Sequence, residues 1–278
     1  MTPPRRIERR PLAMQECGLP RELHPVIRRV LAARGLTEPS ELALALAGMA
    51  HPRALSGVEG AAELVAEAVM QDQRILIVGD FDADGATGTA LSILALKAMG
   101  ATQVDFRVPN RFEFGYGLTV PLVDTLQDSP PDLLITVDSG ISCVDGVARA
   151  RSLGCRVIVT DHHLPGEQLP LADAIVNPNQ PGDGFPSKSL AGVGVVFYLL
   201  GVVRGKLRQQ GWFSRSRAEP NLAGFLDLVA LGTVADLVPL DHNNRILVRQ
   251  GLERIRAGQA RPGLMALLRL GKRDYRYA

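Results

Sequence analysis

Residues 75–96, ILIVGDFDADGATGTALSILAL, are the stretch that decides the expected fold of this chain. A short apolar run typical of a buried strand leads into three aspartates at alternate positions, Asp80, Asp82 and Asp84. Glycine and a second apolar run, long enough for a helix, follow. A strand, a loop and a helix in this order form the repeating unit of α/β folds. The stretch therefore predicts an α/β fold with negative charge at the carboxyl end of one strand.

The same alternation continues on both sides of this stretch. Helical spacing of apolar residues predicts helices over 59–71, 88–99, 120–127 and 143–153. Short apolar runs predict strands over 74–79, 103–108, 132–137, 156–160 and 174–176. Short apolar strands separated by amphipathic helices are typical of a parallel sheet that is covered on both faces. We therefore expect a doubly wound, mainly parallel sheet flanked by helices, with a helical extension at the N-terminus.

Composition and charge narrow the class of protein. The chain has 278 residues, of which 46% are hydrophobic and 22% charged, as expected for one large or two small globular domains. Its longest apolar run, 190–203, is shorter than the roughly 20 residues of a membrane-spanning helix, and no apolar segment follows the basic N-terminus. Cys17, Cys143 and Cys155 lack the spacing of a disulfide framework or a zinc knuckle. We expect a soluble, cytoplasmic protein without a membrane partner.

Two runs of sequence are rich in basic residues, although the net charge of the whole chain is only +2. Residues 204–217 contain five basic and no acidic side chains, and residues 269–276 contain four basic side chains and one acid. Such runs fit a polyanionic ligand. A solvated helix face is the commoner explanation for one run alone.

Acids and histidines follow three of the predicted strands, in the segments GDFDADG, VDSG and TDHH. The residues concerned are Asp80, Asp82, Asp84, Asp138, Asp161, His162 and His163. Ligands of doubly wound folds bind beyond the carboxyl ends of the strands, so these side chains are expected to converge. Carboxylates this close repel one another unless cations neutralise them. Carboxylate oxygens with imidazole nitrogen suit Mn²⁺ or Mg²⁺, and a carboxylate shared by two ions about 4 Å apart is typical of phosphoryl displacement.

Each of these features also has a simpler explanation. An aspartate at a strand end often caps the next helix, and a histidine pair at a strand end is more often structural. The D-x-D pattern also occurs in haloacid-dehalogenase-type phosphatases and in Ca²⁺ loops. The segment GATGTA lacks the G-K-[ST] ending of a phosphate-binding Walker loop. The conjunction at three successive strand ends favours a two-metal phosphoesterase.

Five segments resemble the successive motifs of the DHH phosphoesterase superfamily. They are GDFDADGATGTAL, RVPNRFEFGYGL, LLITVDSGIS, VIVTDHHLPG and LVALGTVADLVPL. The resemblance covers roughly residues 45–270, and PNRFEFGYGL together with GTVADLVPL is similar to the RecJ branch of single-stranded-DNA exonucleases. It implies metal-dependent 5′-to-3′ hydrolysis of single-stranded DNA to 5′-mononucleotides, in DNA repair and recombination, with two Mn²⁺ or Mg²⁺ ions.

The resemblance also implies roles for individual residues. The implied metal ligands are Asp82, Asp84, Asp138, His162 and Asp236, with Asp138 as the bridging carboxylate. By sequence pattern alone, Asp236 is only the end of an apolar helix. The implied catalytic residues are Asp80, Asp161 and His163. Asp80 is a motif acid in or next to the set of metal ligands. Asp161 orients a neighbouring histidine. His163 either binds metal or donates a hydrogen bond to the phosphate or the leaving oxygen.

By its residues alone, RVPNRFEFGYGL could be a surface loop whose aromatic side chains pack onto the sheet, but the resemblance implies that Arg111 and Tyr116 contact the 5′-terminal nucleotide. The guanidinium of Arg111 suits a phosphate, and Tyr116 offers a face for base stacking, worth about 1–3 kcal/mol. Gly117 lets the backbone come close to substrate. The loop phenylalanines, Phe112 and Phe114, are expected to pack onto the sheet.

A long apolar helix is expected to start near residue 189, with Ser187 or Ser189 as its N-cap. Its first N–H groups would be free to bind a phosphate.

The resemblance implies a catalytic domain at 51–240 between an N-terminal helical arm, 1–50, and C-terminal helices, 241–278, that lead toward a second domain outside this chain. Because contacts along many phosphates supply most of the affinity for a strand, we expect this portion to keep its metal site but to degrade DNA weakly. Implied partners are single-stranded DNA and replication or repair proteins, such as a single-strand-binding protein or a helicase.

Two other functions stay open from sequence. A DHH phosphatase acting on short oligonucleotides or nucleotide phosphates would use the same cluster. A catalytically weak binding or scaffold module is the other alternative, although the presence of every motif acid and both histidines argues against it.

Overall fold

The computed structural model describes residues 18–278, which form two compact units divided between Gly48 and Met49. The described part of the first unit is helical and contains α1 (Pro25–Ala32) with the short 3-10 helices η2 (Pro39–Leu42) and η3 (Leu46–Gly48). In the described residues of the chain, no helix is both long and apolar enough to cross a membrane. The second unit holds the sheet and the candidate site.

The second unit is built on one five-stranded sheet. Its strands are β1 (Ile75–Gly79), β2 (Val104–Arg107), β3 (Leu133–Val137), β4 (Arg156–Thr160) and β5 (Ala174–Val176). They lie in the order β2-β1-β3-β4-β5, and every neighbouring pair is parallel. The sequence-based prediction of a doubly wound parallel sheet is confirmed, and each strand lies within two residues of its expected limits. The winding reverses between β1 and β3, the position at which such folds bind ligands.

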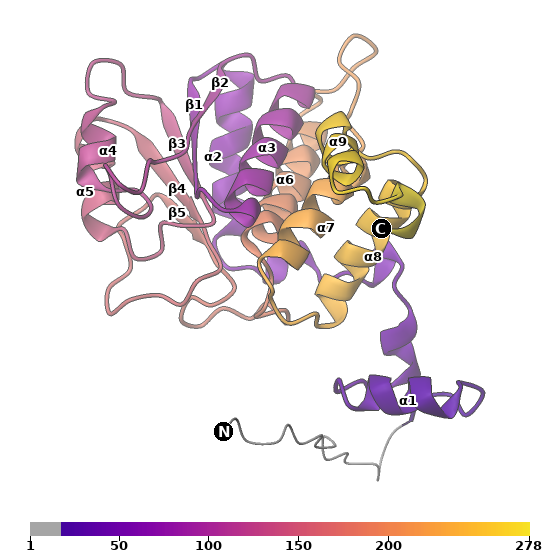
Figure 1. Ribbon diagram of the computed structural model, residues 1–278. Coiled ribbons are helices and arrows are strands. Elements are labelled where there is room, and N and C mark those ends of the chain that lie inside the picture. The colour runs from indigo at the N-terminus through magenta and orange to yellow at the C-terminus, as the bar shows by residue number, and fades with distance from the viewer. Residues whose placement is uncertain (1–17) are drawn as a thin grey trace. The chain divides into compact units, whose positions relative to one another are not determined.

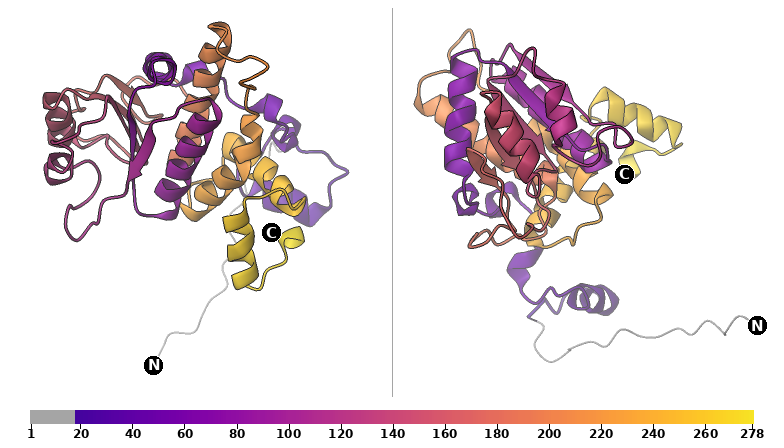
Figure 2. Two further views of the ribbon diagram at one scale, coloured as in Figure 1. Left: turned by 90° about the horizontal axis from the view of Figure 1, so that it is seen from above. Right: turned by 90° about the vertical axis from the view of Figure 1, so that its left-hand side faces the viewer.

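Helices cover both faces of this sheet. One face carries α4 (Val120–Asp124) and α5 (Val144–Ser152), and the other carries α2 (Val58–Met70), α3 (Ala83–Ala98) and α6 (Gly192–Gln209) (Figure 1). The view from above shows the same order of layers (Figure 2). Farther from the sheet, α7 (Leu226–Ala235) packs on α3 and α6, and α8 (His242–Arg256) packs on α7. The remaining elements are η4 (Pro52–Ala54), η5 (Leu222–Phe225), α9 (Pro262–Leu270) and η6 (Tyr275–Tyr277).

Each face of the sheet has an apolar core. Between the sheet and α4 and α5, a buried cluster includes Leu122, Val147 and Val157. Phe114 packs partly buried against this cluster, as expected, whereas Phe112 has 94% of its surface exposed and the expectation for it was wrong. Phe112 therefore contributes nothing to the core.

The start of α3 differs from its expected position. The apolar pattern predicted a helix from residue 88, but α3 begins at Ala83 because the Asp82 carboxylate accepts the N–H of Gly85 at 2.9 Å and caps the first turn. As a result, Asp84 lies inside the helix and is buried. Capping thus places one motif acid at the surface and the next one in the interior.

Most of the basic side chains in the run 204–217 have local partners. Arg204 and Arg208 pair with Glu219. Lys206 pairs with two glutamates of α2, Glu59 at 2.8 Å and Glu63 at 2.7 Å. These ion pairs favour the structural explanation of the run over a polyanion-binding one.

Candidate metal centre

The sheet register brings the motif residues to one level. In neighbouring strands, Gly79 is opposite Val137, and Val137 is opposite Thr160. The ladder continues one residue farther, because Asp80 N–H donates to Val137 O at 3.2 Å and Asp138 N–H donates to Thr160 O at 3.1 Å. The first residues beyond β1, β3 and β4 therefore stand side by side.

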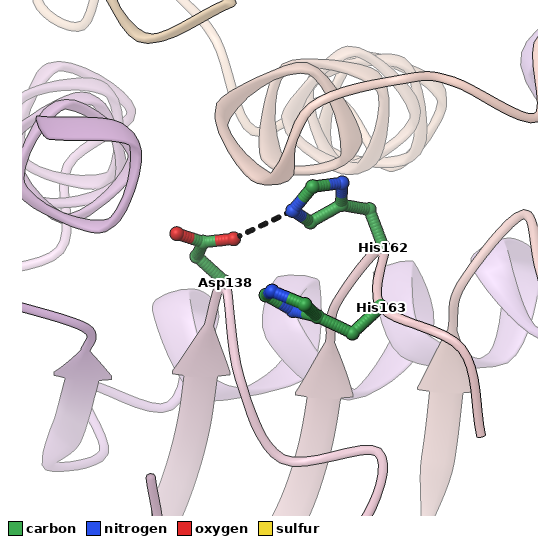
Figure 3. A group of neighbouring side chains, drawn as sticks. All are labelled: Asp138, His162 and His163. Atoms are coloured by element: carbon green, nitrogen blue, oxygen red, sulfur yellow. Dashed lines mark ion pairs between the residues drawn. The ribbon is translucent and has the colours of Figure 1, made fainter. Parts of the chain in front are cut away.

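His162 lies at the centre of the cluster. Its Nε2 atom is 3.0 Å from Asp138 Oδ1, 3.6 Å from Asp236 Oδ2 and 3.9 Å from Asp84 Oδ2. Figure 3 shows Asp138 and the two histidines just beyond the ends of neighbouring strands. Asp236 arrives from a different direction, since it is the C-cap of α7. Carboxylates from three other parts of the fold therefore converge on one imidazole nitrogen.

Three ligand-type atoms in this cluster are buried without a hydrogen-bond partner: Asp138 Oδ1, His162 Nε2 and Asp236 Oδ2. The 3.0 Å approach of the first two atoms lacks the geometry of a hydrogen bond. Buried polar atoms are nearly always bonded, so three unpaired atoms that face one another are the expected signature of a cation site. The observed side chains therefore fit a metal centre.

Among residues 18–278, three overlapping groups could each hold an ion, with ligand atoms within 4.8 Å of one another. They are Asp80, Asp82 and Asp138; Asp84, His162 and Asp236; and Asp138, His162 and His163. None of the three includes a cysteine, and all donors are carboxylate oxygens or imidazole nitrogens. This donor chemistry suits Mn²⁺ or Mg²⁺ rather than a thiolate-bound metal. Because Asp138 is common to two groups, it is in position to be shared by two ions.

Burial raises the pKa of four carboxyl groups in the cluster. Burial, reinforced by the charge of Asp138, raises the pKa of Asp84 to about 7. Burial, followed by the charge of Asp82, raises the pKa of Asp138 to about 9. Burial also raises the pKa of Asp80 and of Asp236. A cation stabilises the ionised carboxylates and so opposes each of these shifts.

The N-terminus of α6 holds the buried carboxylate of Asp84. Its Oδ2 accepts the N–H of Gly192 at 2.6 Å, and its Oδ1 accepts the N–H of Val193 at 2.9 Å. The expectation that these N–H groups bind a phosphate was wrong. The helix has Ala191 as its N-cap, with no side-chain cap, so the expectation of a serine cap was also wrong.

Asp161 belongs to none of the three possible ligand groups and instead binds the histidine pair. Its carboxylate accepts the N–H groups of Ile141, His162 and His163, and it lies 2.8 Å from Nδ1 of the His163 ring. Burial acts to raise the pKa of Asp161, but the hydrogen bonds outweigh burial and lower it. The bond to Asp161 raises the pKa of His163 to about 9. The bond to Asp161 therefore favours the protonated form of the half-exposed His163 ring.

A cavity of about 480 Å³ opens next to the cluster. Its lining includes Asp80, Phe81, Arg111, Tyr116 and His163. The Arg111 guanidinium lies 3.8 Å above the centre of the Phe81 ring, a cation–π contact that directs it over the cavity. The Tyr116 hydroxyl donates to the backbone carbonyl of Asp138 at 3.3 Å. Two of the three expected substrate-binding residues therefore line a cavity at the metal cluster.

Gly117, the third expected substrate-binding residue, is not part of the cavity lining. Its backbone has a positive φ of 71°, and an added Cβ would lie 2.8 Å from Cys143 Sγ. A turn and close packing therefore account for this glycine.

Three residues at the site escaped the sequence-based prediction: Phe81, Asn177 and Asn179. Phe81 lies between two motif acids, Asp80 and Asp82, and no pattern in the sequence marks it. Asn177 directly follows β5, just as Asp138 follows β3, so its place after a strand was the available signal. The two asparagines donate to the backbone carbonyls of the histidine pair.

Comparison with known proteins agrees with this geometry. The family model "DHH family, N-terminal domain" matches residues 74–233. The single-stranded-DNA-specific exonuclease RecJ of Escherichia coli (strain K12) is 57% identical over 261 residues, which are 94% of this chain and 45% of that protein. The protein of the same name from Bacillus subtilis (strain 168) is 39% identical over 92% of this chain and 31% of its own length. The chain thus spans less than half the length of these curated relatives.

Solved structures show the same fold. A crystal structure of exonuclease RecJ bound to manganese has a TM-score of 0.63 and 39% identity, covering 73% of this chain and 49% of that one. RecJ from Thermus thermophilus in complex with Mn²⁺ has a TM-score of 0.70 and 34% identity, covering 88% of this chain and 33% of that one. Together with the matched family model, which covers more than half of the residues, these similarities show that the chain belongs to the DHH family.

Proposed function

We propose that this chain is a metal-dependent exonuclease that hydrolyses single-stranded DNA from the 5′ end and releases 5′-mononucleotides. The observation that carries the proposal is the set of buried, unpaired ligand atoms on Asp138, His162 and Asp236. The name of the Escherichia coli relative, a single-stranded-DNA-specific exonuclease, supports the choice of substrate.

Asp82, Asp84, Asp138, His162 and Asp236 are the proposed ligands of two divalent ions, with Asp138 shared. The overlap of the three potential ligand groups supports this assignment, as do RecJ structures in complex with Mn²⁺ and with Mg²⁺. Such ions, when bound, activate water for attack on phosphorus and offset the charge of the phosphate. The paired N–H groups of α6 keep the Asp84 carboxylate in one orientation.

His163 and its surroundings are the proposed contacts of the scissile phosphate. The bond to Asp161 favours the protonated ring at the cavity wall, from which the ring would donate a hydrogen bond to a phosphate or leaving oxygen. Asp80 lies beside it, next to the proposed ion between Asp82 and Asp138. These three side chains, Asp80, Asp161 and His163, are the proposed catalytic groups around the ions.

The cavity wall is the proposed site for the 5′-terminal nucleotide. Arg111, directed by its contact with Phe81, would bind a phosphate, and Tyr116 would stack on the base. Gly117 would act on this site indirectly, because the absence of a Cβ lets the loop pack closely against Cys143.

The wider assignments rest on the family resemblance. We assign the catalytic domain to residues 51–240, between the helical arm and the C-terminal helices. We place the protein in the cytoplasm, in DNA repair and recombination, with a single-strand-binding protein or a helicase as its protein partner.

Hydrolysis of end-labelled oligonucleotides tests the proposed function. With Mn²⁺, the first cleavage by the 278-residue chain is expected to release a labelled mononucleotide from a 5′-labelled single strand. A 3′-labelled copy of the strand is expected to become shorter step by step. A duplex of the same sequence is expected to resist hydrolysis, and Asp138→Asn is expected to be slower by roughly 10³-fold. Release of the 3′ label first, or equal cleavage of the duplex, would contradict the proposal.

A further inference from the structure

Two asparagine side chains hold the backbone of the histidine pair. Asn179 Nδ2 donates to the carbonyl of His162 at 2.6 Å, and Asn177 Nδ2 donates to the carbonyl of His163 at 2.9 Å. The two asparagines are also joined, because Asn177 Oδ1 accepts the N–H of Asn179 at 2.7 Å. Both histidine carbonyls lie beyond the end of β4 and are therefore fixed by side chains rather than by the sheet.

The asparagines are themselves held firmly. Asn177 is fully buried and directly follows β5, whose last residue, Val176, accepts the N–H of Asp161 at 3.2 Å. Lys188 closes the following loop, since its Nζ donates to Pro178 O at 2.6 Å and its own carbonyl accepts from Asn179 at 3.1 Å. The donors to the histidine carbonyls are thus part of a closed hydrogen-bonded loop.

The backbone of His162 is hydrogen-bonded at both its N–H and its carbonyl. On one side, Asp161 accepts the N–H of His162 at 2.7 Å, and on the other side Asn179 donates to its carbonyl. With both ends bound, the direction in which the His162 ring leaves the backbone is restricted, and this ring carries the unpaired Nε2 at the centre of the cluster. An amide is the group required here, because Asn177 donates to one backbone group and accepts from another.

We propose that Asn177 and Asn179 are positioning residues of the metal centre, which aim the His162 ring at Asp84, Asp138 and Asp236 by holding the carbonyls of the histidine pair. The inference rests on the proposed function, because it needs the cluster to bind metal. Groups that orient a metal ligand typically change metal affinity by about 10–100-fold when they are removed.

Mn²⁺ binding to the 278-residue chain tests the proposal. Asn179→Asp keeps the size of the side chain but replaces the donor with an oxygen that repels the His162 carbonyl. It is expected to weaken Mn²⁺ binding about 10–100-fold in titration calorimetry, carried out well below the unfolding midpoint of the variant in EDTA. In the hydrolysis assay, excess Mn²⁺ is expected to restore the kcat of Asn179→Asp but not that of Asp138→Asn.

Asn221→Asp is the matched control. Asn221 is exposed and uses only its oxygen, which accepts the N–H of Ala223 at 3.1 Å, so aspartate preserves the bond. This variant is expected to bind Mn²⁺ like the parent chain.

Two results separate failure of the inference from failure of the proposed function. Absence of Mn²⁺ binding by the parent chain would overturn the metal centre itself. Binding by the parent chain with unchanged affinity in Asn179→Asp would overturn the positioning role alone. If Asn179→Asp lowers the unfolding midpoint in EDTA, the Mn²⁺ affinity of Asn179→Ala tests the positioning role instead, because alanine removes the donor without adding a charge. An unchanged affinity in Asn179→Ala would then overturn the positioning role.

Discussion

Asp138 combines several features that are unfavourable for folding. Its backbone is in the left-handed region with φ of 61°, the residue is only 1% exposed, and Oδ1 has no hydrogen-bond partner. Aspartate and asparagine tolerate the left-handed region better than other non-glycine residues. Such features persist where function requires them. Asp138 is therefore expected to lower the stability of the metal-free chain.

Asp138→Asn tests whether this side chain lowers the stability of the metal-free chain while supporting hydrolysis. Burial disfavours ionisation of Asp138 and raises its pKa to about 9, so folding at neutral pH requires this carboxyl to take up a proton. Asparagine needs no proton and keeps the side-chain size and backbone preference, so it is expected to stabilise the metal-free chain by about 1 kcal/mol or more. Hydrolysis is expected to fall by roughly 10³-fold. Thermal unfolding in EDTA and the oligonucleotide assay measure the two effects. The exposed Asp128, replaced by asparagine, is the control, and a destabilised Asp138→Asn would contradict the argument.

Two glycines of α6 give a matched pair of substitutions. A Cβ on Gly192 would lie 2.6 Å from Asp138 Oδ1, whereas a Cβ on Gly201 would meet nothing within 4 Å. Gly192→Ala is expected to destabilise the chain by about 1–3 kcal/mol and to weaken Mn²⁺ binding. Gly201→Ala is expected to stabilise it by about 0.5–1 kcal/mol, the usual gain in a helix interior. Urea unfolding and Mn²⁺ titration compare them, and equal behaviour of the two variants would refute the packing argument.

At the scale of elements, the sequence predicted the strands better than the helix starts. Strand ends follow from apolar runs that stop at polar residues. Helix starts depend on capping, and two of them involve the site: Asp82 begins α3 early, and Asp84 takes the first N–H groups of α6. The second interaction joins residues 108 positions apart, so no local pattern could reveal it. Serines near residue 189 looked like caps because serine often has that role.

Ser187 instead connects the loop before α6 to α8. Its hydroxyl donates to Asp241 Oδ2 at 2.7 Å, while Asp241 Oδ1 accepts the N–H of Asn244 at 2.9 Å and caps α8. Ser187→Ala is expected to cost about 1 kcal/mol and Asp241→Ala about 1–3 kcal/mol, because the latter loses the cap as well. Their shared bond predicts that the double variant costs less than the sum. Urea unfolding of the three variants measures this, and strict additivity would contradict a shared bond.

At the scale of the whole molecule, the site assembles from distant segments. The alternation of strands and helices predicted the sheet, and its carboxyl edge predicted where Asp80, Asp138 and the histidine pair meet. Asp236 was found only through the family resemblance, because its place depends on α7 packing against α3 and α6. The asparagines that hold the histidine carbonyls were missed, since the chain around them reads as an ordinary proline- and glycine-rich loop.

Metal binding is expected to stabilise the folded chain. An ion that binds only the folded state raises the free energy of unfolding by about 2.7 kcal/mol at a concentration about 100 times its Kd. The unfolding midpoint should therefore rise with added Mn²⁺ and return to its starting value with EDTA. Asp138→Asn should show little of this rise, and an equal rise in both proteins would place the bound Mn²⁺ elsewhere.

The central claim is that the carboxylate and histidine cluster holds two divalent ions with Asp138 between them. Anomalous diffraction at the manganese absorption edge, from crystals of the chain grown with Mn²⁺, tests it most directly. Two peaks are expected that both border Asp138, one beside Asp80 and Asp82 and the other beside His162 and Asp236. Crystals grown with Mn²⁺ that show no peak at Asp138 would contradict it.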